Sequence, residues 1–118
     1  MSFIINRIRS IGYAAKGAYQ LVCTESSIKV QFVIAIIMTI AGLYFQISTT
    51  EWIIQTLAIG LVMSIEGVNT TIEAISDFIH PDRHDKIGFI KDISAGAVFI
   101  ASIAAVIVGL LIYIPKIT

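Results

Sequence analysis

The sequence predicts an all-α integral membrane protein with an N-terminal amphipathic surface helix and three transmembrane helices. Of its 118 residues, 57% are hydrophobic and 14% are charged, and the mean hydropathy of +0.90 exceeds that of soluble domains. Residues 93–114 contain no charged side chain, and this stretch is long enough to cross the hydrocarbon core of a bilayer. Together these observations make the membrane the expected solvent of the fold.

Composition also excludes several classes of function. Eight Lys and Arg balance eight Asp and Glu, so no basic excess is present to neutralise the phosphates of a nucleic acid. One cysteine, Cys23, and two histidines cannot supply a disulfide or a zinc site from one chain. We expect a single membrane domain over residues 1–118, with no nucleic acid among its partners.

Residues 2–24 are predicted to form a helix that lies in the membrane interface. Six apolar side chains recur at helical spacing on one stripe: Ile4, Ile8, Ile11, Ala15, Tyr19 and Val22. Arg9, Lys16 and Gln20 fall on the opposite side, as expected for a helix between lipid and water.

Three membrane spans are expected at about 27–46, 51–79 and 90–114. The polar residues 46–51 form a turn, followed by Trp52, which is typical of membrane interfaces. The apolar stretch 52–65 is too short to cross the bilayer, so this helix must continue through Glu66 toward Phe78. Residues 80–91, with Pro81 and several charges, are predicted to form a polar loop.

The distribution of Lys and Arg predicts the orientation. Seven of the eight lie before the first span or between the second and third: Arg7, Arg9, Lys16, Lys29, Arg83, Lys86 and Lys91. Because positive residues favour the cytoplasmic side, we expect the N-terminus and the 80–91 segment there. Lys116 is the exception on the far side.

Polar residues of the second span fall on one helix face: Glu66, Asn69, Thr70, Glu73 and Asp77. A charged side chain at the bilayer centre costs about 2.5–3.5 kcal/mol, so this face should meet protein, water or a cation. Clustered carboxylates suit Mg²⁺, which commonly takes one or two of them together with the phosphates of a nucleotide. Interhelical hydrogen bonds and ion pairs alone are the structural alternative.

The neighbouring polar segment carries side chains suited to phosphate: Arg83, His84, Lys86 and Lys91. The sequence contains no G-x-x-x-x-G-K-[ST] motif, no dinucleotide-binding glycine motif and no H-R-D or D-F-G signature. A kinase with this sequence would therefore be unrelated to the soluble nucleotide-binding folds.

The string from Glu66 to Asp77, E-G-V-N-T-T-I-E-A-I-S-D, resembles the signature of the prokaryotic diacylglycerol kinase and undecaprenol kinase family. G-Y-A-A-K-G at 12–17, Glu25 with Lys29, and Lys91 with Asp92 extend the resemblance over most of the chain. It implies a homotrimer of the bacterial inner (cytoplasmic) membrane, with active sites between subunits. The implied activity is ATP-dependent phosphorylation of a lipid alcohol, with diacylglycerol as the expected acceptor and undecaprenol as the alternative.

The resemblance also implies roles for individual residues. Glu66 is expected to be the catalytic base, and Glu25 and Glu73 are expected to hold Mg²⁺. The residues expected to bind ATP are Tyr13, Asp82, Arg83, His84, Lys91 and Asp92. The residues expected to support the site are Asn69, Asp77, Lys16 and Arg7. The chain departs from the family pattern at Asn6, where an arginine is expected, and at Gln31, where an acidic residue often occurs.

Two further functions compete with the kinase. A small proton-coupled multidrug exporter would use one deep glutamate to exchange H⁺ for a cationic substrate. Several carboxylates beside a basic segment favour the kinase over that transporter. A structural membrane subunit would show no ATP turnover with any lipid.

Overall fold

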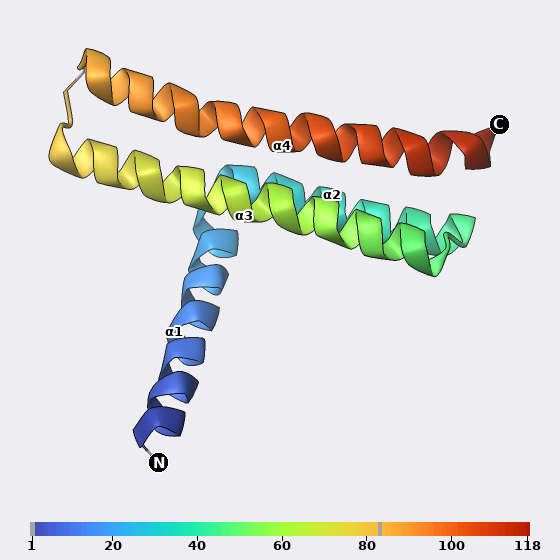
Figure 1. Ribbon diagram of the computed structural model, residues 1–118, viewed down its shortest axis with the longest axis horizontal. Helices are drawn as coiled ribbons and strands as arrows, with labels where there is room; N and C mark the ends of the chain where they lie inside the picture. Colours follow the sequence, from blue (N-terminus) through green and yellow to red (C-terminus); the bar gives the residue numbers. More distant parts are fainter. Residues whose placement is uncertain (1, 83) are drawn as a thin grey trace.

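The computed structural model describes residues 2–82 and 84–118, and in these ranges the chain is entirely helical (Figure 1). The four helices are α1 (Ser2–Thr24), α2 (Ser26–Phe45), α3 (Thr49–Ile79) and α4 (Asp85–Ile117). Helices α2, α3 and α4 form an antiparallel bundle, and α1 leaves its side at a large angle (Figure 1). The predicted surface helix and three spans are therefore confirmed as elements of the fold.

The break between α1 and α2 is a single residue. Glu25 adopts an extended conformation, with φ −93° and ψ 120°, and caps the N-terminus of α2 without a capping hydrogen bond from its side chain. Its backbone N–H still donates to Leu21 O at 3.1 Å, so the chain turns sharply with little loss of hydrogen bonding. The carboxylate of Glu25 is consequently not used by the local backbone.

A tight turn over residues 46–48 joins α2 to α3, within the predicted segment 46–51, and α3 already begins at Thr49. Gln46 adopts the left-handed conformation, with φ 52°, that ends many helices. Ser48 and Glu51 form a reciprocal capping box, with hydrogen bonds of 2.9 and 3.1 Å, that starts α3. Trp52 packs on Gly42, where a methyl group would lie only 2.6 Å from the indole ring. These contacts hold α2 and α3 antiparallel.

Helices α2, α3 and α4 are each long and apolar enough to cross a membrane. With 20 residues, α2 matches one crossing, whereas the 31 residues of α3 extend for about 46 Å and exceed the hydrocarbon core. The end of the α3–α4 hairpin accordingly extends beyond the start of α2 (Figure 1). Asp77, near the end of α3, and Lys91, near the start of α4, belong to this end of the hairpin.

The predicted polar loop at 80–91 is much shorter in the structure. Helix α4 begins at Asp85, five residues before the expected start of the third span. His84 caps it, and His84 Nδ1 accepts a hydrogen bond from Lys86 N at 3.1 Å. Because this cap stabilises a helix start among charged residues, Lys86 and Lys91 belong to a helix rather than to a loop.

Polar contacts fix the register of the three spanning helices. Gln55 Nε2 donates to Met38 O at 3.2 Å, and Tyr113 Oη donates to Gln55 Oε1 at 2.6 Å. At the opposite end of the hairpin, Lys91 pairs with Asp77. Gln55 and Asp77 are 22 residues apart on α3, and their partners on α4, Tyr113 and Lys91, are also 22 residues apart. Both contacts therefore fit one antiparallel register, and the two helices run side by side for about 33 Å.

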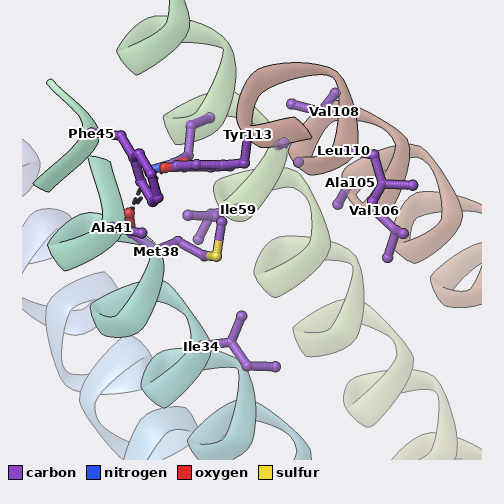
Figure 2. Close-up of a pocket in the computed structure, with 13 residues that line it drawn as sticks. Ile34, Met38, Ala41, Phe45, Ile59, Ala105, Val106, Val108, Leu110 and Tyr113 are labelled. Atoms are coloured by element: carbon purple, nitrogen blue, oxygen red, sulfur yellow. Dashed lines mark hydrogen bonds between the residues drawn. The ribbon is translucent and has the colours of Figure 1, made fainter. Parts of the chain in front are cut away.

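A small apolar core, consisting of Ile47, Ile112 and Tyr113, lies at the end of the bundle near the α2–α3 turn. Beside it is a cavity of about 480 Å³, with Tyr113 and Phe45 at one end and Ile34 at the other (Figure 2). Many large apolar side chains elsewhere on α2–α4 are exposed. This distribution suits a bundle that lies in lipid, where apolar side chains need no cover from water.

Candidate functional site

The polar face of α3 changes from buried to exposed along its length. Glu66 is 8% exposed and Asn69 is 9% exposed, so both point into the bundle. One and two turns further, Glu73 and Asp77 are exposed. This polar face of α3, called the ridge below, consists of Glu66, Asn69, Thr70, Glu73 and Asp77. It joins a buried carboxylate inside the bundle to exposed carboxylates at its projecting end.

Asn69 carries the unpaired polar atom of this ridge. Its Nδ2 donates to Glu73 Oε1 at 3.1 Å, which orients one of the two expected metal ligands. Its Oδ1 is buried and has no hydrogen-bond partner among the described residues. Because an unpaired buried acceptor is costly, this atom is suited to a donor or a cation brought by a ligand.

Glu25 approaches the ridge from α2. The Gln55–Met38 hydrogen bond places Gln55 of α3 opposite Met38 of α2. Because the two helices are antiparallel, Glu25, 13 residues before Met38, lies opposite position 68, 13 residues after Gln55. Glu25 therefore lies level with the Glu66–Asn69 turn of α3. It is half-buried.

The expected metal ligands do not form a closed cage in one chain. Within 2–82 and 84–118, no group of three or more His, Cys, Asp or Glu side chains is arranged to hold a metal ion. Glu25, Glu73 and the Asn69 amide nevertheless offer the hard oxygen donors that Mg²⁺ prefers, and Mg²⁺ usually takes only one or two protein carboxylates. The donor chemistry fits Mg²⁺ bound together with phosphates and water.

Lys91 and Asp77 form an ion pair across the α3–α4 hairpin, beyond the start of α2. Their side chains are 35% and 60% exposed, so the pair is partly solvated and contributes little to stability. The lysine remains accessible to an anionic ligand. Asp92, the next residue, is exposed on α4.

The hairpin turn brings two imidazoles together. The rings of His80 and His84 lie 5.0 Å apart, and His80 Nδ1 contacts Asp82 O at 2.7 Å. Asp82 and His84 are exposed. Arg83, also expected to bind ATP, lies outside the described residues.

The expected site residues on α1 are separate from this ridge. Arg7, Tyr13 and Lys16 are all exposed on the part of α1 that projects from the bundle (Figure 1). The Arg7 guanidinium instead stacks over the ring of Phe3, with 5.1 Å between the Cζ atom and the ring centroid. Within the described part of one chain, the structure does not bring these three residues to Glu66.

A second cavity of about 180 Å³ lies one turn from Glu66 toward the middle of the bundle. Gln31 and Ser102 are its polar lining residues, and Gln31 Oε1 is buried without a partner in the described chain. It shares Ile34 and Ile59 with the cavity in Figure 2, so the two form one largely apolar groove. The sequence analysis noted Gln31 only as a departure from the family pattern and did not expect it to line a cavity.

Comparison with known proteins identifies the family to which this chain belongs. The family described as "Prokaryotic diacylglycerol kinase" matches residues 12–113. The undecaprenol kinase of Bacillus subtilis (strain 168) is 34% identical over 113 residues, which cover 95% of this chain and 92% of the relative. The diacylglycerol kinase of Escherichia coli (strain K12) is 29% identical over 100 residues, covering 85% of this chain and 82% of the relative.

The match covers the acidic ridge of α3, Glu25, the α3–α4 hairpin and the three spanning helices, and it selects the kinase over the exporter and the structural subunit. This chain belongs to the prokaryotic diacylglycerol kinase family, a family of membrane lipid kinases that includes undecaprenol kinase.

Proposed function

We propose that this chain transfers the γ-phosphate of ATP to the hydroxyl group of a membrane lipid alcohol at Glu66. The observation that carries the proposal is the gradient along α3, from the buried Glu66 to the exposed Glu73 and Asp77. An apolar alcohol reaches the buried end from lipid, and a charged nucleotide reaches the exposed end from water. The ridge therefore extends from the part of the site that the lipid reaches to the part that the nucleotide reaches.

Glu66 acts as the general base. It takes the proton of the lipid hydroxyl as that oxygen forms a bond to the γ-phosphorus and the bond to the ADP oxygen breaks. Its burial limits competition from water, because a solvated base would also activate water and hydrolyse ATP. Asn69 Oδ1, one turn away, is an acceptor without a partner in the described chain, and it can take a cation or another hydrogen-bond donor brought by the bound substrates, while the hydroxyl proton goes to Glu66.

Glu25 and Glu73 are the residues that would hold Mg²⁺. The hydrogen bond from Asn69 supports this role for Glu73, because it keeps one carboxylate oxygen in a fixed orientation. When bound, Mg²⁺ neutralises charge on the phosphate oxygens. Lys91 supplies a further positive charge near the exposed end of the ridge.

A homotrimer with sites between subunits accounts for the residues that one chain leaves apart. The expected ATP-binding residues lie in three regions, represented by Tyr13 on α1, Asp82 at the hairpin turn and Lys91 on α4. A neighbouring subunit that supplies α1 or the hairpin would complete the nucleotide site. The extensive exposed apolar surface of the spanning helices leaves room for such contacts.

The site end of the bundle faces the cytoplasm of a bacterial inner membrane in this proposal, because ATP is found there. The excess of Lys and Arg at that end supports this orientation. The exception, Lys116, pairs with Glu51 at 3.1 Å, so its charge is balanced at the far end. The N-terminus is then cytoplasmic.

Diacylglycerol is the expected acceptor, and undecaprenol is a second candidate. The first expectation comes from the sequence analysis. The chain is 34% identical to the Bacillus subtilis undecaprenol kinase and 29% identical to the Escherichia coli diacylglycerol kinase, and this difference favours undecaprenol. Both are long apolar alcohols, and the groove beside Gln31 offers an apolar surface to either one. Purified protein with Mg·ATP, offered each lipid separately, distinguishes them by the ratio of kcat/KM values.

The substitution Glu66→Gln tests the site. It preserves the size of the side chain and removes the base, so kcat should fall by at least ~10²-fold while the helical content and oligomeric state stay unchanged. Turnover close to that of the unsubstituted protein would contradict the assignment. Glu51→Gln, at the far end of α3, is the matched control and should leave kcat unchanged.

A further inference from the structure

Gly67, the neighbour of Glu66 on α3, contacts the surface helix. A methyl group at this position would lie 2.8 Å from Leu21 Cδ2, well inside van der Waals contact. Gly60, two turns earlier on the same helix, has open space where a methyl group would go. A glycine at 67 therefore makes room for a side chain of α1, whereas a glycine at 60 does not.

Leu21 is one of the few residues through which α1 touches the bundle. No residue of α1 is buried, and α1 projects away from the other helices toward its N-terminus (Figure 1). Leu21 is half-buried and lies one turn before Glu25, where the chain enters α2. Its contact with Gly67 therefore fixes the end of α1 against the turn of α3 that carries Glu66.

We propose that Leu21 and Gly67 are a positioning pair. Their contact sets the distance between the end of α1 and the turn of α3 that carries Glu66, where the headgroup of the lipid alcohol binds. This inference rests on the proposed function, because it assigns the space beside Glu66 to the acceptor. Because Leu21 lies against Gly67, a displacement of the end of α1 changes its distance from the turn of α3 that carries Glu66. Since a misplacement of about 1 Å can cost 10²-fold in rate, the contact controls how well the hydroxyl meets Glu66.

The pair can be tested by moving the large side chain from one helix to the other. Rotation of the flexible Leu21 side chain can accommodate a methyl group at 67, so the substitution chosen is Gly67→Leu, which places two large side chains in one space. Leucine is a better helix former than glycine, so α3 itself is not weakened. The exchange variant Leu21→Ala/Gly67→Leu restores one large and one small side chain at the contact.

Steady-state kinetics with diacylglycerol and with undecaprenol should separate lipid from nucleotide effects. Gly67→Leu should lower kcat/KM for the lipid by about tenfold or more and change KM for ATP by less than about twofold. The exchange variant should recover most of the loss, and Gly60→Leu should behave like the unsubstituted protein. Undiminished lipid kcat/KM in Gly67→Leu, or no recovery in the exchange variant, would overturn the inference.

A crosslink tests the contact without relying on activity. In a Cys23→Ser background, Leu21→Cys/Gly67→Cys should form an intramolecular crosslink with a short bifunctional thiol reagent, whereas Leu21→Cys/Gly60→Cys should not. Absence of the first crosslink overturns the positioning pair and leaves the proposed function intact. An unsubstituted protein without turnover on either lipid overturns both.

Discussion

Removal of one hydroxyl group far from Glu66 should weaken the bundle measurably. Tyr113 Oη donates to Gln55 Oε1 at 2.6 Å, and Gln55 Nε2 donates to Met38 O at 3.2 Å. These two bonds join all three spanning helices, and both side chains are buried. The substitution Tyr113→Phe keeps the ring and leaves Gln55 Oε1 without its donor.

The expected loss follows from two magnitudes. An acceptor left unpaired in a buried site costs about 1–3 kcal/mol. Hydrogen bonds between membrane helices contribute about 0.6 kcal/mol on average and about 1.7 at most. The ranges overlap near 1–1.7 kcal/mol, so Tyr113→Phe should raise the unfolding equilibrium constant by about 5- to 18-fold.

Gln55→Leu should cost less than Tyr113→Phe. After this substitution the Tyr113 hydroxyl still lies 3.2 Å from Met38 O and keeps an acceptor. The double variant should be more stable than the sum of the single losses predicts, because it leaves no unpaired amide oxygen.

Equilibrium unfolding in mixed SDS micelles, followed by circular dichroism, measures these losses. Lipid kinase turnover, assayed well below the midpoint, should stay within about twofold, because Gln55 lies 11 residues, or about 16 Å, from Glu66 along α3. Strictly additive losses, or a larger loss for Gln55→Leu, would refute the reasoning.

Three further predictions concern the exposed end of the ridge and the α2–α3 turn. Glu73→Gln keeps an oxygen for Asn69 but loses the charge, so the Mg²⁺ concentration for half-maximal activity should rise by about tenfold or more; an unchanged magnesium titration would count against the role of Glu73 as a ligand. Lys91→Met should raise KM for ATP about tenfold, as expected for loss of one phosphate contact. It should cost little stability, because the Lys91–Asp77 ion pair is partly exposed to solvent. An unchanged KM for ATP would contradict a role of Lys91 in nucleotide binding. Gly42→Ala places a methyl group 2.6 Å from the Trp52 ring, and the free energy of unfolding should fall by about 1–3 kcal/mol; an equal effect of Gly60→Ala would contradict this cause.

The helices could be predicted because each has a local cause in the sequence. Apolar length predicts the spans, the polar residues 46–51 predict the turn, and the stripe on residues 2–24 predicts the surface helix. The segment 80–91 was mispredicted, because its charges and Pro81 resemble a loop. A cap at His84 instead starts α4 among those charges.

The polar face of α3 could also be predicted, but the burial of its residues could not. Helical spacing places Glu66, Asn69 and Glu73 on one face of α3 before any contact is known. Only the packing of α2 and α4 decides that Glu66 and Asn69 are buried while Glu73 is exposed. Residues that the sequence analysis treated as part of an apolar stretch, such as Gln55, prove to fix the register.

Apolar length and polar spacing are properties of a segment by itself, because a bilayer and a helix impose fixed dimensions on any chain. The sequence alone therefore determined that three helices cross the membrane and that acidic groups gather on one of them. Only the tertiary structure decided which helix meets which at Glu66, including the contact of Leu21 with Gly67. Such contacts join residues distant in sequence, and their geometry depends on the simultaneous packing of all four helices.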